Sequence, residues 1–152
     1  MKIGIIGSGQ TGARFGKALA APGDQVMYSY SRDPRKLDEL AAATPGALTG
    51  SPQQAAEFGE VVLLSIWVPQ VDEVLAAVGP SLAGKILLTC VSGLQPDFSG
   101  ARIGIPTELT ESVAETIARK IPQAMVVESL NLTFAEILDS ASRDFGEHRP
   151  SL

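Results

Sequence analysis

The chain has few of the residues on which many kinds of site depend. Its 152 residues include one cysteine, one histidine and one tryptophan. The single cysteine, Cys90, excludes an internal disulfide framework and suits a reducing compartment such as the cytoplasm. His148 lies in a polar C-terminal stretch, where a surface role is favoured over acid–base chemistry. The sequence therefore offers neither a metal-ligand cluster nor a catalytic triad.

Long apolar runs and excess positive charge are also lacking. The longest apolar stretch, residues 61–68, is interrupted by Ser65 and is too short to span a membrane. Acidic residues outnumber basic ones by 17 to 12, giving a net charge of −5, which argues against nucleic-acid binding. Met1 leads directly into an expected strand and leaves no room for a signal peptide. We therefore expect a cytoplasmic protein in which any anionic ligand is held by a local basic patch.

Apolar runs alternate with amphipathic segments along the whole chain. Strands are expected at residues 2–6, 25–30, 47–49, 61–67, 86–91 and 125–130. Helices are expected at 11–21, 34–43, from 52, at 71–78 and at 112–121, with mostly loop over 92–110 and a further helix starting near 134. Continuous apolar strands between helices indicate a parallel sheet covered on both faces. This predicts a single α/β domain over residues 1–152, with a doubly wound, mostly parallel sheet of the Rossmann type.

A glycine motif joins the first expected strand to the first expected helix. The run Gly7-Ser8-Gly9-Gln10-Thr11-Gly12 fits the pattern G-x-G-x-x-G. In this position Gly7 permits the tight turn, Gly9 lets the backbone approach a pyrophosphate, and Gly12 allows close helix–strand packing. The helix N-terminus then presents free N–H groups to phosphates. The alternative is a glycine turn that binds nothing, and its position between strand and helix argues against that.

The residues after the second strand favour NADPH over NADH. NAD-binding domains place an acidic residue there to bind the ribose 2′-hydroxyl. Here Ser31 and Arg32 follow the strand instead, and both can bind a 2′-phosphate. Asp33, which precedes Pro34, is better interpreted as a helix cap, and Ser51-Pro52 repeats this start for the next helix. Arg35 and Lys36 fall in the first helical turn, where a bound phosphate would offset their unfavourable position, although a solvated basic turn is equally compatible.

These motifs resemble the coenzyme F-420-dependent NADP oxidoreductases, and the cytosolic domain of the STEAP metalloreductases is similar. The resemblance rests on residues 5–12 and 31–34, and on three later segments, 111–115, 121–124 and 126–131. It implies NADP(H) as cofactor and hydride exchange with a deazaflavin, coenzyme F-420, or a flavin. The family continues beyond Arg149-Pro150 with a strand, a helix and a closing strand, which we expect to be absent here.

The nicotinamide pocket is expected where strands four, five and six end, because ligands of open α/β sheets bind beyond the carboxyl ends of the strands. By resemblance, Asn131 would lie near the nicotinamide carboxamide. Trp67 could equally be a core aromatic residue, and Ser92 could simply cap a loop. Hydride transfer is chemistry of the cofactors, so no protein group is predicted to be catalytic. The candidates for this pocket are Ser65, Ile66, Trp67, Pro69, Val91, Ser92, Gly93, Asn131 and Thr133.

Three functions remain open from the sequence. The first is an NADPH-dependent oxidoreductase acting on a small-molecule redox partner, coenzyme F-420 or a flavin. The second is a non-catalytic module that binds or senses NADP(H). The third is a reductase of a small imine or carbonyl compound, although such enzymes usually add a helical C-terminal domain. We expect a homodimer, with a second copy covering the sheet edge or the crevice, and neither a membrane nor a nucleic acid as partner.

Overall fold

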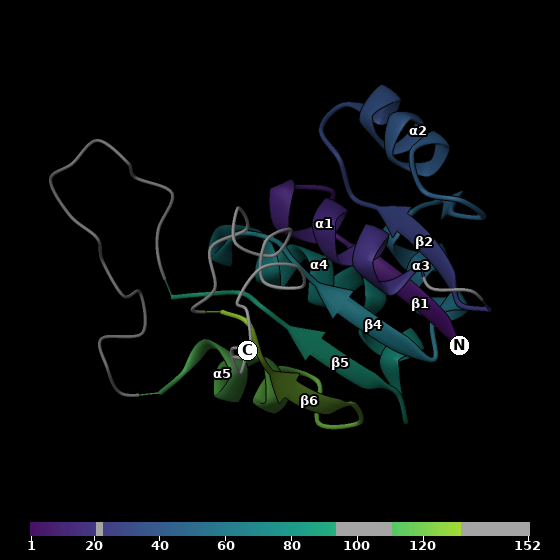
Figure 1. The fold of residues 1–152 in the computed structure, drawn as a ribbon. Helices are drawn as coiled ribbons and strands as arrows, with labels where there is room; N and C mark the ends of the chain where they lie inside the picture. The colour runs from purple at the N-terminus through teal and green to yellow at the C-terminus, as the bar shows by residue number, and fades with distance from the viewer. Residues whose placement is uncertain (21–22, 94–110, 132–152) are drawn as a thin grey trace, which may run out of the picture.

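Strands and helices alternate in a computed structural model that describes residues 1–20, 23–93 and 111–131 (Figure 1). The described strands are β1 (Lys2–Ile6), β2 (Gln25–Ser29), β3 (Leu48–Thr49), β4 (Val61–Leu64), β5 (Ile86–Thr89) and β6 (Met125–Glu128). The described α-helices are α1 (Gln10–Leu19), α2 (Pro34–Ala42), α3 (Pro52–Phe58), α4 (Val71–Val78) and α5 (Val113–Lys120).

The six strands form one sheet in the order β3-β2-β1-β4-β5-β6, and every pairing is parallel. This order is that of the doubly wound dinucleotide-binding fold, so the predicted fold class is confirmed. The chain winds outward from β1 to β3 and then crosses back to β4 on the other side of β1. The carboxyl ends of β1 and β4 therefore flank the switch point, where ligands of this fold bind.

Helices cover the two faces of the sheet in separate groups (Figure 1). On one face Phe15 of α1 is buried with Ile5 and Tyr28, and Leu37 of α2 packs against them. On the other face α3, α4 and α5 bury their apolar side chains against β1, β4 and β5 in a second cluster that includes Ile117. The strands β1, β2, β4 and β5 thus place alternate side chains in two different cores, which is why they are almost continuously apolar.

Side-chain caps fix the starts of three helices. Asp33 accepts a hydrogen bond from the backbone of Arg35 at 3.1 Å, with proline at the first position of α2. Ser51 starts α3 and Ser112 starts α5, each in a reciprocal capping box. In the second box the bonds from Ser112 hold the pKa of Glu115 below its usual value. The caps predicted at Asp33 and Ser51 are confirmed.

The strands end earlier than their apolar patterns predict. The predicted fourth strand runs to residue 67, whereas β4 ends at Leu64. Ser65 still donates a backbone hydrogen bond to Ile6 at 2.9 Å, but β1 stops there and offers no further partner. The chain then enters a 3-10 turn at Val68–Gln70. The predicted strands at 25–30, 86–91 and 125–130 likewise overrun the observed ends by one or two residues.

A glycine–aromatic contact sets α1 against β2. A Cβ atom on Gly16 would overlap the ring of Tyr28, which is fully buried. The Tyr28 hydroxyl lies 3.1 Å from Thr44 Oγ1 and donates to the carbonyl of Ala13 at 3.4 Å. Burial raises the pKa of this phenol, so it remains a neutral donor. The helix is thereby held with its N-terminus at the ends of β1 and β2.

Two predicted elements, the loop over 94–110 and the helix near 134, lie outside the described residues. Within the part of the chain that the structure describes, no helix is long and apolar enough to cross a membrane.

Candidate functional site

The glycine-rich loop is held rigidly between β2 and β4. Gly7 has φ +116°, and a Cβ there would overlap the Ser65 carbonyl. Its backbone N–H donates to Ser29 at 3.0 Å. Ser8 is buried and donates twice to the Tyr30 carbonyl, from its backbone at 3.2 Å and from its hydroxyl at 3.1 Å. The turn therefore requires glycine at position 7 for both conformation and space.

The other two glycines of the motif, Gly9 and Gly12, differ in the space around the position that a Cβ atom would occupy. A Cβ on Gly12 would overlap the Gly7 carbonyl, so glycine there lets α1 approach β1. Gly9 has φ −68°, which any residue adopts, and its Cβ would meet nothing within 4 Å. Packing thus explains two glycines and leaves Gly9 unexplained. An anionic group approaching the backbone in that open space accounts for it.

The N-terminus of α1 is suited to such an anion. Gly9 caps the helix without a side-chain hydrogen bond, and no acidic residue lies in the first turn. Backbone N–H groups of a first helical turn have no partner inside the helix. Gln10 is exposed and Thr11 is half-buried. Together with the open approach at Gly9, these features fit a pyrophosphate.

The segment after β2 carries the predicted 2′-phosphate residues. Ser31 Oγ accepts the Asp33 N–H at 3.1 Å, which leaves the serine hydroxyl hydrogen available to a ligand. Arg32 and Lys36 are exposed. Arg35 instead donates to the Asp33 carboxylate from Nε at 3.3 Å and from Nη2 at 3.2 Å. Its charge is balanced by its own helix cap, so Arg32 and Lys36 are the stronger candidates.

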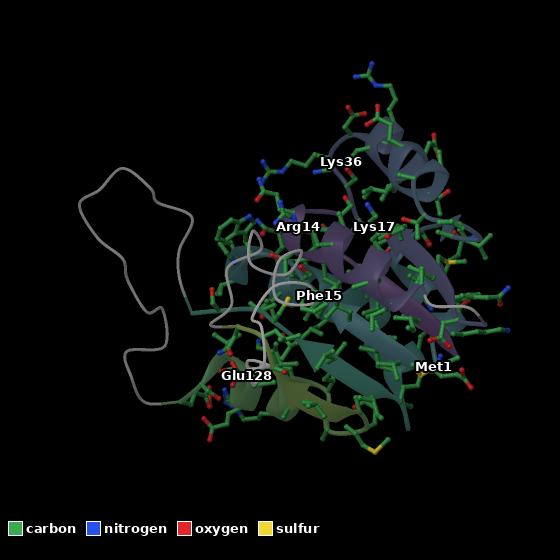
Figure 2. All side chains as sticks on the ribbon, viewed as in Figure 1. Met1, Arg14, Phe15, Lys17, Lys36 and Glu128 are labelled. Carbon is green, nitrogen blue, oxygen red and sulfur yellow. The ribbon has the colours of Figure 1, made fainter. Side chains whose placement is uncertain are left out.

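Positive charge at this end also comes from α1. Figure 2 shows Arg14 of α1 and Lys36 of α2 at the end of the molecule where β1 and β2 finish. Arg14 was not among the residues predicted from the sequence. Its position two residues beyond Gly12 could have drawn attention to it, because that is the second turn of the helix under the glycine motif.

The predicted nicotinamide residues follow three adjacent strands. Leu64, Thr89 and Glu128 are register partners, so the segments after them meet at one edge of the sheet. Trp67 is 43% exposed, which makes the core-aromatic interpretation wrong. Ser65, Ile66, Ser92, Gly93 and Asn131 are half-buried, Val91 is buried, Pro69 is exposed, and Thr133 lies outside the described residues.

Two polar groups at this edge are already engaged. Asn131 donates to Glu128 at 3.0 Å, an interaction that fixes the amide close to the end of β6. Cys90 lies 3.6 Å from the Leu64 carbonyl, and burial raises the pKa of its thiol. A thiol with a raised pKa is a poor nucleophile, so Cys90 is not a candidate for covalent chemistry.

A hollow of about 540 Å³ lies at the opposite end of the sheet, beside the starts of β1 and β2. The two lysines that line this hollow, Lys2 and Lys85, make contacts within the fold. Lys85 donates to the carbonyls of Ala56 and Glu57 at the end of α3, and Lys2 lies 5.5 Å from the centre of the Phe58 ring. Because ligands of this fold bind at the carboxyl ends of the strands, we do not assign the cofactor to this hollow.

The sheet order, the glycine loop and the basic segment after β2 define a dinucleotide-binding domain of the doubly wound class. The chain belongs to the family described as NADP oxidoreductase, coenzyme F-420-dependent, whose model matches residues 2–93. This is a family of NADP-dependent oxidoreductases, and NADP(H) is accordingly the cofactor of the site. A search of curated protein sequences found no match.

Solved structures share the fold. The chain is 26% identical to a candidate F-420-dependent NADP reductase from Arthrobacter sp. FB24, with a TM-score of 0.83 over 96% of this chain and 69% of that one. A hypothetical protein from Sinorhizobium meliloti is 20% identical, with a TM-score of 0.77 and coverage of 96% and 68%. An imine reductase from Myxococcus stipitatus in complex with NADP⁺ is 22% identical, with a TM-score of 0.63. The match covers 84% of this chain and 40% of that reductase.

We predict that Gly9→Val leaves the protein folded but abolishes measurable NADPH binding. A Cβ atom at this position meets no protein atom within 4 Å, and the valine side chain enters the space through which the pyrophosphate would approach. Isothermal titration calorimetry gives the affinity, and thermal unfolding reports the fold. Gly16→Ala is the opposite control, since its methyl group overlaps Tyr28 and should lower the unfolding temperature. Retained NADPH affinity in folded Gly9→Val would show that the motif is only a turn.

Proposed function

We propose that the protein transfers a hydride between NADP(H) and a deazaflavin, coenzyme F-420, or a flavin. The observation that carries the proposal is the family match over residues 2–93, which includes both the glycine loop and the basic segment after β2. The structural likeness to the Arthrobacter protein over 96% of this chain supports it. The lone cysteine suits the cytoplasm, where we place this activity.

The residues of the chain supply binding and orientation. The turn from Gly7 to Gly12 and the start of α1 would hold the pyrophosphate, and Ser31, Arg32 and Lys36 would hold the 2′-phosphate. The nicotinamide of NADP(H) provides the hydride. The half-buried edge around Ser65, Ser92 and Asn131 would orient that ring and exclude water from one side of it. Reduction of the deazaflavin or flavin also takes up one proton at a ring nitrogen, which solvent at the open side of the site would supply, so no residue of the chain is assigned as the acid.

A reductase of a small imine or carbonyl compound is the second candidate. Its support is the fold shared with the imine reductases, of which this chain spans about two fifths. A module that binds NADP(H) without turnover is the third possibility. The first two candidates differ in the compound that accepts the hydride, and the third transfers none. Turnover assays with several acceptors therefore distinguish them.

We predict that NADPH binds at least about tenfold more tightly than NADH, and that Arg32→Ala removes most of this difference. A charged hydrogen bond contributes about 1.5–3 kcal/mol, so the variant should lose roughly ten- to 150-fold in NADPH affinity. Affinity for NADH should barely change. Lys17→Ala, which removes an exposed cation at the far end of α1, is the matched control. Similar affinities for both cofactors in the wild-type protein would contradict the assignment of Ser31 and Arg32.

We predict that the oxidised F-420 absorbance falls when the protein and NADPH are present. FMN, FAD and a cyclic imine serve as competing acceptors under the same conditions. Faster turnover with the imine would favour the second candidate. Tight NADPH binding with no turnover of any acceptor would support the binding module and overturn the oxidoreductase proposal.

We also propose that two copies associate as a homodimer. Ile86 and Met125 are register partners on β5 and β6 and are 38% and 54% exposed. Val127 is 45% exposed and lies two residues beyond Met125, on the same face. Contiguous apolar surface of this kind is typical of an interface between copies.

Light scattering should therefore give the mass of a dimer of the 15.9 kDa chain. Val127→Glu should reduce it to the monomer mass, because a charge would be buried at the contact. A monomeric wild-type protein at micromolar concentration would exclude the dimer.

A further inference from the structure

The chain leaves β6 through a strained turn. Among the described residues, two other than glycine have a left-handed backbone, Tyr30 with φ +61° and Leu130 with φ +64°. Residues with a Cβ atom rarely adopt this conformation, whereas glycine adopts it freely. The Tyr30 conformation is held by the two hydrogen bonds that its carbonyl accepts from Ser8. The conformation of Leu130 needs a separate explanation.

Contacts before, within and after the turn hold Leu130 in place. Ser129 donates its backbone N–H to the Thr89 carbonyl at 3.1 Å, which continues the pairing with β5 one residue beyond the end of β6. The Leu130 side chain is half-buried and packs against the core cluster on the α1 face of the sheet. Asn131 then donates from Nδ2 to Glu128 Oε1 at 3.0 Å. The left-handed residue thus buries its own side chain and brings Asn131 back toward the strand that it follows.

The bond between Asn131 and Glu128 has only one possible polarity. An ionised carboxylate accepts hydrogen bonds and cannot donate them, so the NH₂ group of the Asn131 amide must face Glu128. Because the amide is planar, its carbonyl oxygen then faces away from the carboxylate. Glu128 is exposed and lies at the end of the sheet away from Met1 (Figure 2). An exposed carboxylate therefore holds a half-buried amide in one of its two orientations.

We propose that Glu128 is a positioning residue, which orients Asn131 so that the amide oxygen accepts a hydrogen bond from the NH₂ group of the nicotinamide carboxamide. Asn131 follows β6 at the same edge of the sheet as the segments that begin with Ser65 and Cys90. A carboxamide carries both donors and an acceptor, so a side chain of fixed polarity selects one of the two ways in which it can bind. The assignment rests on the proposed transfer of hydride by NADP(H) at this edge, but not on which compound accepts the hydride.

A purely structural bond would behave differently. If Glu128 only closed the turn after β6, its loss would lower the unfolding temperature or weaken the binding of all nicotinamide cofactors by one common factor. A positioning role instead changes the ratio of affinities between cofactors that differ only in the carboxamide. Such a ratio is also insensitive to the altered charge of a variant, because the phosphates are the same in every ligand.

Calorimetry with NADP⁺ and two analogues tests the polarity of the Asn131 amide. The 3-acetylpyridine analogue has a methyl group in place of NH₂, so it should bind about five- to tenfold more weakly than NADP⁺. The thionicotinamide analogue keeps the NH₂ group and should bind about as well as NADP⁺. Equal affinities for NADP⁺ and the acetylpyridine analogue would overturn the proposal, whatever the result with F-420. Absence of binding by all three ligands would overturn the cofactor site itself, and this proposal with it.

Substitutions of Glu128 test its own contribution. Lysine only donates, so Glu128→Lys should reverse the Asn131 amide and remove or invert the preference for NADP⁺ over the acetylpyridine analogue. Glu128→Gln can still accept from Asn131 and should retain most of the preference. Asn131→Ala, which removes the amide, should bring the two affinities close together.

Thermal unfolding shows whether each variant is folded. A full wild-type preference for NADP⁺ in folded Glu128→Lys would overturn the positioning role. If that variant does not fold, the comparison of ligands in the wild-type protein and in Asn131→Ala still decides whether the amide oxygen accepts from the carboxamide, and loss of the preference in Glu128→Gln would count against the carboxylate as its partner.

Discussion

The turn at Gly7 is the constraint on which the site depends. Its backbone N–H is bonded to the end of β2, and its missing Cβ leaves room for the carbonyl of Ser65 after β4. One residue thus joins the two halves of the sheet at the point where the strand order reverses. The direction of α1 follows from this turn and from the close contact between Gly12 and the Gly7 carbonyl. The strained conformation of Tyr30 follows from it as well, because Ser8 in the same turn binds the Tyr30 carbonyl twice. The geometry of the anion site is therefore set by backbone contacts at the ends of the strands rather than by long side chains.

An acidic protein binds a highly charged anion here by arranging its charges locally. The net charge is −5, yet the acid nearest the 2′-phosphate position, Asp33, is used as a helix cap and paired with Arg35. Its negative charge is largely balanced at that point, and the charges of Arg32 and Lys36 face solvent. The uncapped start of α1 adds a partial positive charge without any ionisable group. Each contribution is short-range, so the remaining negative surface lowers affinity only weakly at physiological salt.

The sequence predicts the parts of this structure that depend on local chemistry. The parallel, doubly wound sheet follows from alternating apolar strands and helices, and the caps at Asp33 and Ser51 follow from an acceptor side chain before proline. Strand ends were overestimated because an apolar residue such as Ile66 packs in the core after its neighbour in the sheet has stopped. The engagement of Arg35 by Asp33 and the exposure of Trp67 depend on side-chain geometry, which residue type alone does not specify. Tyr30 gave no signal, since tyrosine is an ordinary strand residue and its left-handed conformation arises from distant hydrogen bonds.

The two ends of the cofactor site are built on different principles, and this bears on how one fold serves several reactions. The proposed nucleotide end is built on backbone that the strands hold, namely the turn at Gly7 and the buried Ser8, which donates to the carbonyl of Tyr30. The segments proposed for the nicotinamide end lie beyond the strand pairing, where Trp67 is exposed and the Asn131 amide donates to Glu128 at the end of β6. Among the described residues, the hydrogen bonds that hold Gly7 and Ser8 run to Ser29 and Tyr30, so substitutions of outer side chains such as Trp67 and Asn131 leave those bonds in place. Solved structures with this fold include the Arthrobacter protein and imine reductases, so the fold alone does not specify the hydride acceptor.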